Sequence, residues 1–250
     1  MRYFFLFSLL FFSYKVSAQQ IKIHSHNDYA QAEPFVNAWR NKAYTIEADV
    51  YAGAGLPVAH DKKDIKAGKT LETMYLRPII KLFKEYHGHI SGDTNYTPVL
   101  MIDIKENSEA VITELVKMLS PYRNIFDRSV NPKAVQVVLS GERGPVQQWT
   151  QWPAYILFDG RPYEAYNDTS LQRVFFVSDS YMNYHSNNKD SVTTHLKQLA
   201  TKVHSMHKLL RLWGTPDNPS SWEMLLSSGV DIINTDKVAD CRNYFLEKNQ

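Results

Sequence analysis

Short apolar runs alternate with longer amphipathic stretches along most of this chain. The runs are rich in Ile, Val, Leu and Phe, which is typical of strands buried on both faces. They lie at 21–24, 45–51, 99–105, 135–140, 155–160, 173–179, 209–214 and 230–236. The stretches between them place apolar residues three and four positions apart, which predicts helices. The clearest of these are 70–86, 108–119, 191–208 and 220–229.

Strands that alternate with helices in this way indicate a parallel α/β fold. Within a chain of 250 residues, the order predicts a single (β/α)8 TIM barrel in which irregular elements are allowed. A doubly wound open sheet is the alternative. No GxGxxG or GxxxxGKS/T motif follows a predicted strand, which disfavours a nucleotide-binding sheet. Ser108 and either Ser220 or Ser221 stand where the N-caps of two helices are expected.

The first 18 residues differ in pattern from the rest of the chain. Arg2 precedes ten mostly apolar residues at 3–12, and residues 16–18 (Val-Ser-Ala) have the small side chains found before a signal-peptidase site. The apolar run is shorter than the ~20 residues that span a bilayer. We therefore predict a signal peptide over 1–18 and one domain over 19–250. The protein is then expected to be secreted or periplasmic, with no stable membrane anchor after cleavage.

The charge of the remaining chain disfavours two classes of partner. Without Arg2 and Lys15, the 28 basic residues fall to 26, which equals the number of acidic residues. Binding to nucleic acid or to an anionic membrane surface depends on dense positive charge, so neither is expected. Cys241 is the single cysteine, which excludes an internal disulfide, and the chain is long enough to fold without one. We expect a monomer.

Four predicted strands carry polar side chains on one face and apolar side chains on the other. Glu47 and Asp49 share a face of the strand at 45–51. The other polar pairs are His24 and His26, Asp103 and Lys105, and Arg211 and Trp213. In a barrel these side chains would point inward near the C-terminal ends of the strands, where active sites of this fold lie. An ordinary strand with one wet face would explain one such pattern, but not four.

Three of these residues suggest a metal site. Glu47, Asp49 and Asp103 would bring three carboxylates into one pocket, and such close like charges resist joint ionisation unless a cation lies between them. Ca²⁺ or Mg²⁺ suits the set because both ions prefer oxygen ligands, and Asn27 could add a fourth oxygen. Zn²⁺ is disfavoured by the oxygen-rich set and the lack of cysteine ligands.

Two histidine-containing segments could supply proton carriers beside that metal. One is HSHN (24–27) and the other is VAHD (58–61). Two imidazoles that flank a metal-bound phosphate suit acid/base catalysis near neutral pH. Lys105 and Arg211 are predicted to hold the remaining phosphate charge.

Four segments carry motifs that belong together. They are SHNDY (25–29), IEADVYAGAGLPVAHD (46–61), MIDIK (101–105) and GVDIINTD (229–236). They resemble the superfamily of glycerophosphodiester phosphodiesterases and phosphatidylinositol-specific phospholipases C. SHNDY is similar to the Ser-His-Asn-x-Tyr of the eukaryotic phospholipase C barrel, and the last segment resembles the glycerophosphodiesterase ending. The whole pattern looks most like a small secreted branch with an HSHNDY motif.

The resemblance implies a role for each motif residue. His26 and His60 would be the acid/base pair, Asn27, Glu47, Asp49 and Asp103 would bind the metal, and Lys105 would contact phosphate, with Arg211 and Trp213 as further substrate-binding residues. His24 is expected to be structural, and Asp28 and Tyr29 to shape the loop. Two departures stand out. The His-Arg-Gly opening of glycerophosphodiesterases is absent, and Asp103 replaces the usual Glu, which leaves room for a bridging water.

The predicted function is therefore that of a metal-dependent phosphoric diester hydrolase. Its substrate would be a small-molecule or lipid-derived phosphodiester, such as a glycerophosphodiester or a phospholipid head group. An amidohydrolase-like barrel is one alternative, because HSH also fits the His-x-His of that class. Its further metal-binding histidines are missing from the ends of the fifth and sixth strands, which read FDGR and VSDSYMN. A non-catalytic barrel that binds a phosphoryl ligand is the other alternative.

Overall fold

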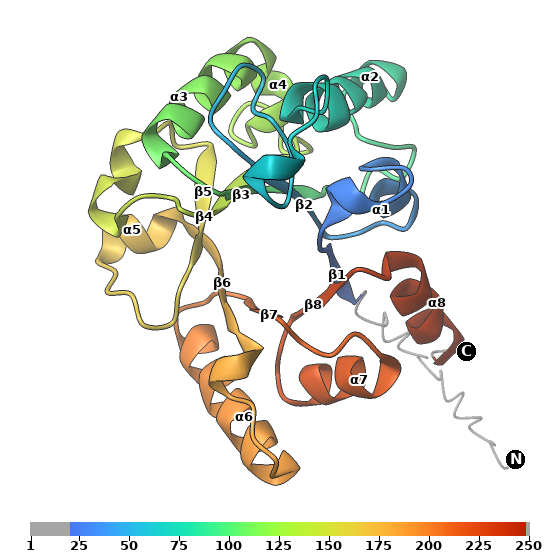
Figure 1. The fold of residues 1–250 in the computed structure, drawn as a ribbon, viewed down its shortest axis with the longest axis vertical. Coiled ribbons are helices and arrows are strands. Elements are labelled where there is room, and N and C mark those ends of the chain that lie inside the picture. The colour runs from blue at the N-terminus through green and yellow to red at the C-terminus, as the bar shows by residue number, and fades with distance from the viewer. Residues whose placement is uncertain (1–20, 249–250) are drawn as a thin grey trace, which may run out of the picture.

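Eight parallel strands close into a barrel at the centre of the molecule, and the helices surround it (Figure 1). The computed structural model describes residues 21–248, with Lys189 described by its main chain alone. The strands are β1 (Lys22–Ser25), β2 (Thr45–Val50), β3 (Val99–Ile104), β4 (Gln136–Gly141), β5 (Ile156–Gly160), β6 (Val174–Ser180), β7 (Leu210–Trp213) and β8 (Ile232–Thr235). Each strand pairs with its neighbours in sequence, and β8 pairs with β1. The predicted (β/α)8 barrel is confirmed, and the open sheet is excluded.

The connections around the barrel are irregular in places. The α-helices are α1 (Val36–Arg40), α2 (Arg77–Glu85), α3 (Ser108–Leu119), α4 (Arg123–Phe126), α5 (Asp168–Arg173), α6 (Lys189–Ser205), α7 (Pro219–Ser227) and α8 (Val238–Lys248). Between β4 and β5 the chain forms only the 3₁₀-helix η5 (Val146–Gln151). The helix predicted over 70–86 is divided into a π-helical turn, η3 (Glu72–Leu76), and α2. Pro78 has no N–H for the usual i→i−4 hydrogen bond, which accounts for the change of helix type at this point.

Asparagine side chains begin two of the predicted helices, one to three positions before the serines that we expected. The side chain of Asn107 caps α3, and that of Asn218 caps α7. Pro219 follows at the first position of α7, where its fixed φ suits a helix start. The predictions of Ser108 and of Ser220 or Ser221 as N-caps are wrong, because each helix starts earlier and its N-cap position is occupied by an Asn, which caps as well as Ser does.

The two faces of the strands pack into separate apolar cores. The outward residues, such as Ile46, Ala48 and Val50 of β2, join the large cluster between barrel and helices. A second cluster lies inside the barrel and comes from inward positions in the N-terminal parts of the strands, with Val99, Met101, Val138, Phe176 and Ile232 as its members. The barrel interior is therefore filled with apolar side chains at one end. The inward polar residues come later along the strands, and so lie at the other end, the mouth.

Two further points concern the predicted signal peptide and helices that could cross a membrane. The predicted signal peptide over 1–18 lies outside the described residues. Within 21–248, no helix combines the length and the apolar character needed to cross a bilayer.

Candidate active site

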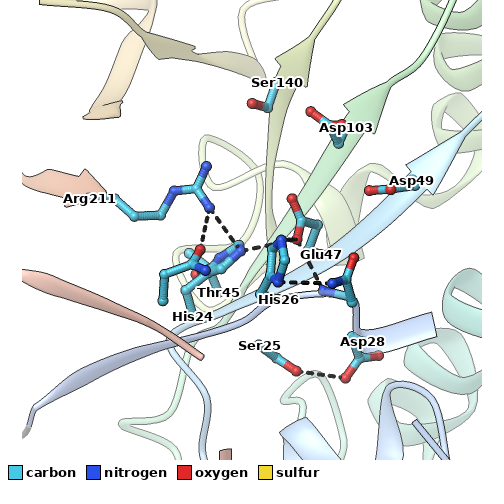
Figure 2. Close-up of polar contacts among 12 residues, drawn as sticks. His24, Ser25, His26, Asp28, Thr45, Glu47, Asp49, Asp103, Ser140 and Arg211 are labelled. Carbon is cyan, nitrogen blue, oxygen red and sulfur yellow. Dashed lines mark hydrogen bonds and ion pairs between the residues drawn. The ribbon is translucent and has the colours of Figure 1, made fainter. Parts of the chain in front are cut away.

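The acidic residues of β2 and β3 meet at one place in the barrel mouth. Asp49 stands opposite Asp103 in the β2–β3 pair, and Glu47 lies on the same face of β2, one inward position deeper. One carboxylate oxygen from each of Glu47, Asp49 and Asp103 lies within 4.8 Å of the others. Figure 2 shows the three carboxyl groups around a common space. The fold thus brings together the three carboxylates predicted from the sequence.

Burial makes the charges of these carboxylates interact strongly. Glu47 is 6 % exposed and Asp49 is 2 % exposed. Burial and the negative charge of Glu47 raise the pKa of Asp49 to about 6, although Lys105 opposes the rise. Burial also favours a higher pKa for Glu47, but nearby positive charge, including that of Arg211, outweighs it and holds that pKa below its usual range. The pocket therefore concentrates negative charge, which a cation would neutralise.

Lys105 follows β3 and places its ammonium group between two of the carboxylates. Its Nζ lies 2.7 Å from Asp49 Oδ2 and 2.6 Å from Asp103 Oδ2. Burial alone would lower the pKa of Lys105, but these two carboxylates outweigh burial and raise it, so the side chain stays charged. The side chain is 25 % exposed, so the ammonium is also open to the mouth. Its predicted contact with a substrate phosphate stays a prediction.

The donor set fits a hard divalent cation. Calcium–oxygen distances of about 2.3–2.6 Å allow ligands on opposite sides of the ion to lie about 5 Å apart, which accommodates the spacing of up to 4.8 Å. The short contacts of Lys105 are with Oδ2 of Asp49 and Oδ2 of Asp103. Among the described residues, no hydrogen bond engages Oδ1 of either carboxylate. Glu47, Asp49 and Asp103 would therefore hold the cation through oxygens that are free or only weakly engaged.

Asn27 and Asp28 lie in the loop that borders this cluster, and their contacts hold the loop in its conformation. Asn27 has a φ of 47°, in the left-handed region that Asn tolerates better than most residues. Its main-chain N–H donates to Glu47 Oε2 at 3.2 Å. The buried carboxylate of Asp28 accepts hydrogen bonds from Ser25, Phe35 and Tyr75, so it holds the loop as expected.

His24 lies beneath the carboxylates as a neutral, buried residue. Its Nε2 is 3.0 Å from Nη1 of Arg211, which can only donate, so Nε2 must accept and Nδ1–H donates to Thr45 Oγ1 at 2.6 Å (Figure 2). Burial and the charge of Arg211 lower the pKa of His24 to about 4. The structural role expected for His24 agrees with these contacts.

His26 is held by a carboxylate at the end of the neighbouring strand, β8. Its Nδ1 lies 2.8 Å from Oδ1 of Asp236, which directly follows β8. Its Nε2 points to the carboxylate cluster, 3.9 Å from Glu47 Oε2. The Asn27 side-chain amide, 3.0 Å from the same Nδ1, can only donate, but the ionised carboxylate of Asp236 is the closer and stronger partner. Nδ1 then carries the proton, and the neutral ring presents an Nε2 lone pair to the cluster.

His60 reaches the cluster at Asp49 from the loop between β2 and α2. Its Nδ1 lies 3.6 Å from Asp49 Oδ2 and 3.1 Å from the hydroxyl of Tyr29. That hydroxyl is also 2.8 Å from Asp49 Oδ2 and 2.8 Å from Asn27 Oδ1. The structure thus brings both predicted acid/base histidines within 4 Å of the carboxylate cluster.

Arg211 and Trp213 lie on the β7 wall. The guanidinium of Arg211 is buried and donates to Ser178, Asn234 and His24. Trp213 is half-buried at the end of β7, with the guanidinium of Arg161 4.9 Å from its ring centre. Contact of Arg211 or Trp213 with a substrate stays a prediction, and the protein partners of Arg211 give it a structural role as well.

Two residues of this site were not assigned from the sequence. Tyr29 was expected only to shape the loop, and Asp236 was given no role. The alternation rule could have identified Asp236, because it shares a face with Ile232 and Asn234 of β8 and follows the C-terminal end of that strand. Tyr29 belongs to the 3₁₀ turn η1 (Asp28–Ala30), where no strand periodicity applies.

Comparison with known protein families identifies the domain. A family model described as an AIM6-like phosphodiesterase domain matches residues 13–145, more than half of the chain. The chain belongs to this family. The AIM6-like match includes both candidate histidines and all three carboxylates of the cluster. It confirms the phosphodiesterase superfamily inferred from the motifs.

Relatives and solved structures agree with this assignment. A protein of Arthroderma benhamiae named altered inheritance of mitochondria protein 6 homolog is 26 % identical, over 90 % of this chain and 84 % of its own. The altered inheritance of mitochondria protein 6 of Eremothecium gossypii is 25 % identical, over 86 % of this chain and 67 % of its own. A glycerophosphodiester phosphodiesterase of Parabacteroides distasonis shares the fold, with a TM-score of 0.57, 15 % identity and coverage of 92 % of this chain and 99 % of its own. A phosphodiesterase of Oleispira antarctica, solved with the product sn-glycerol-3-phosphate, has a TM-score of 0.54, 14 % identity and coverage of 90 % and 96 %.

The relatives correct one prediction about this AIM6-like protein. We expected a secreted or periplasmic protein. The fungal relatives are named for altered inheritance of mitochondria, which implies a cellular role for them rather than a secreted one. The predicted location is therefore wrong.

Proposed function

We propose that this protein is a divalent-cation-dependent phosphodiester hydrolase that uses His26 and His60 as its acid/base pair. The observation that carries the proposal is the position of the two imidazoles within 4 Å of one carboxylate cluster. His26 Nε2 lies 3.9 Å from Glu47, and His60 Nδ1 lies 3.6 Å from Asp49. A phosphoryl group beside the cluster would therefore have two imidazoles within reach, and general acid–base catalysis of its displacement needs one proton acceptor and one proton donor.

The residues of the site would divide the reaction between them. One imidazole accepts the proton of a water or a substrate hydroxyl as the new oxygen–phosphorus bond forms. The other gives a proton to the leaving oxygen as the old phosphorus–oxygen bond breaks. Lys105 contributes fixed positive charge beside the phosphoryl oxygens. A Ca²⁺ or Mg²⁺ ion held by Glu47, Asp49, Asp103 and Asn27 would polarise the phosphoryl group and offset its developing charge.

The same chemistry and the fold support a proposal for the substrate class. The Oleispira antarctica phosphodiesterase, which shares the fold, was solved with sn-glycerol-3-phosphate as product. We propose that the substrate of this protein is a small-molecule or lipid-derived phosphodiester, either a glycerophosphodiester or a phospholipid head group. The His-Arg-Gly opening of glycerophosphodiesterases is absent, so the motifs do not favour a glycerophosphodiester over a phospholipid head group.

The test is hydrolysis of a phosphodiester panel by the purified protein. The panel contains bis(p-nitrophenyl) phosphate, glycerophosphodiesters, phosphoinositides and sphingolipids, each with Ca²⁺, with Mg²⁺ and with chelator. We expect activity that chelator removes, with the rate constant kcat reduced roughly 10²–10⁴-fold by either His26→Ala or His60→Ala.

Three results would count against the proposal. Wild-type activity that survives both chelation and His26→Ala would place the chemistry elsewhere. Binding of phosphoryl ligands without turnover across the whole panel would instead support a non-catalytic barrel. Stoichiometric zinc in the purified protein would favour the amidohydrolase-like alternative.

A further inference from the structure

His60 stands on an open loop, and little holds its ring in place. The side chain is 68 % exposed, and the loop runs from the end of β2 to the turn before α2. Its distance of 3.6 Å from Asp49 Oδ2 is too long for a hydrogen bond. Among the described residues, the hydroxyl of Tyr29, at 3.1 Å from Nδ1, is the hydrogen-bond partner of the ring. A general acid or base needs a fixed ring, so this contact bears on the proposed chemistry.

The direction of the hydrogen bonds at Tyr29 follows from the chemistry of its neighbours. An ionised Asp49 can only accept, so the Tyr29 hydroxyl donates to Asp49 Oδ2 at 2.8 Å. A hydroxyl has one proton, and the charged oxygen of Asp49 is a stronger acceptor than the amide oxygen of Asn27. The Tyr29 oxygen is then left as an acceptor. His60 therefore donates Nδ1–H to Tyr29, and its Nε2 carries a lone pair.

The two histidines of the site are thus fixed in the same tautomer by different means. Asp236 contacts Nδ1 of His26 directly at 2.8 Å. For His60 the carboxylate of Asp49 acts through a hydroxyl placed between them. We propose that Tyr29 is a positioning residue that orients His60 and sets its Nδ1–H tautomer by relaying the charge of Asp49. The inference rests on the proposed function of His60 as a proton carrier.

Two other roles for Tyr29 make different predictions. If its ring only packs the loop, removal of the hydroxyl leaves the His60 tautomer and the turnover rate unchanged. If the hydroxyl serves the cation site, through its contacts with Asn27 and Asp49, its removal changes cation affinity and leaves the His60 tautomer unchanged. A positioning role changes the tautomer of His60 and the rate of the chemical step.

The experiment compares Tyr29→Phe with the wild-type protein by NMR and by kinetics. Long-range ¹H–¹⁵N spectra of histidine-labelled protein report which ring nitrogen carries the proton, and His60→Gln assigns the signals. At a pH where His60 is neutral, we expect the Nδ1–H form in the wild type and a mixture of both tautomers in Tyr29→Phe. On a phosphodiester that the wild type hydrolyses, kcat should fall roughly 10–100-fold, the range typical of lost outer-shell partners. KM should change less than threefold.

Tyr51→Phe is the matched control. In the wild type, the hydroxyl of Tyr51 also binds His60, but it contacts the main chain and not the imidazole ring. The Tyr51 hydroxyl donates to the carbonyl oxygen of His60 at 3.0 Å. Loss of that bond loosens the loop and leaves the ring contact with Tyr29 intact, so the Nδ1–H signature should persist. Calorimetric titration of each variant with Ca²⁺ and with Mg²⁺ measures any effect on the cation.

The outcomes separate this inference from the proposed function. An unchanged His60 tautomer in Tyr29→Phe, or the same change in Tyr51→Phe, would overturn the positioning role. Altered cation affinity with an unaltered tautomer would also overturn it, in favour of a cation role. If the wild type hydrolyses nothing, the proposed function fails, while the NMR comparison still decides whether Tyr29 orients His60.

Discussion

The role of a His–Asp pair depends on where the pair lies in the barrel. His26 and His204 each lie 2.8 Å from a carboxylate oxygen, of Asp236 and Asp231 respectively. Asp236 follows β8 at the mouth, so its partner imidazole faces the carboxylate cluster. Asp231 precedes β8 at the opposite end and also accepts the main-chain N–H of Leu210. The first pair can therefore orient a proton carrier, whereas the second ties β7, β8 and α6 together.

Asp236→Asn should reduce activity with little effect on folding. The amide cannot accept from His26 Nδ1–H as strongly as the carboxylate does, so the ring loses its orientation and tautomer. We expect kcat to fall roughly 10–100-fold, since outer-shell partners of functional histidines contribute about that much. The Asp236 side chain is 54 % exposed, so its pair with His26 should contribute less than about 1 kcal/mol to the free energy of unfolding.

Asp231→Asn is the control for this prediction. It removes the same kind of contact at the other barrel end, and it weakens the bond to the Leu210 main chain. We expect lower stability in urea unfolding and an unchanged kcat for the folded fraction. Equal losses of kcat in the two variants would show that Asp236 has no special role at the mouth.

The ends of β3 and β4 approach each other so closely that only glycine fits at one position. Gly141 has a φ of +68°, and a Cβ there would lie 2.3 Å from the carbonyl oxygen of Ile104 and 2.7 Å from Asp103 Oδ1. The close approach sets the position of the Asp103 carboxylate beside the cluster. Gly214, after β7, has a φ of +69°, but a Cβ added there would meet no atom within 4 Å.

Gly141→Ala and Gly214→Ala therefore separate backbone strain from steric contact. Both variants carry the cost of a left-handed alanine, about 1–2 kcal/mol. Only Gly141→Ala also displaces Asp103 and the end of β3, so we expect a loss of more than about 3 kcal/mol in urea unfolding and weaker cation binding in calorimetry. Similar stabilities and cation affinities in the two variants would contradict this account of the β3–β4 contact.

The strands and helices could be predicted where the spacing of apolar and polar residues determines them. All eight strands were predicted within two residues of their ends, and the inward face of β2 followed from the alternation of Glu47 and Asp49. The helix starts were less accurate, because Asn and Ser are similar caps and only the local main chain decides between them. Tyr29 could not be assigned because a 3₁₀ turn has no face that periodicity specifies. The contact of His60 with Asp49 depends on the path of a long loop.

At the scale of the whole molecule, the barrel interior is divided into an apolar end and a charged end. The apolar cluster of Val99, Met101, Val138, Phe176 and Ile232 fills the first. The mouth holds buried carboxylates, and burial together with the charge of Glu47 raises the pKa of Asp49 to about 6. Strands of a closed barrel cannot separate to relieve the repulsion between these groups, so a bound cation should stabilise the entire fold and not only the site.

Ca²⁺ or Mg²⁺ should therefore raise the midpoint of thermal unfolding, Tm. A ligand at 100 times its Kd that binds only the folded state contributes about 2.7 kcal/mol. For a chain of this size, that contribution corresponds to roughly 5–10 °C. Differential scanning calorimetry with the cation, and with choline chloride at equal ionic strength, separates specific binding from screening. Asp49→Asn removes a ligand and part of the repulsion, so its Tm should not respond to the cation. An equal shift in this variant and in the wild type would mean that the ion binds elsewhere on the molecule.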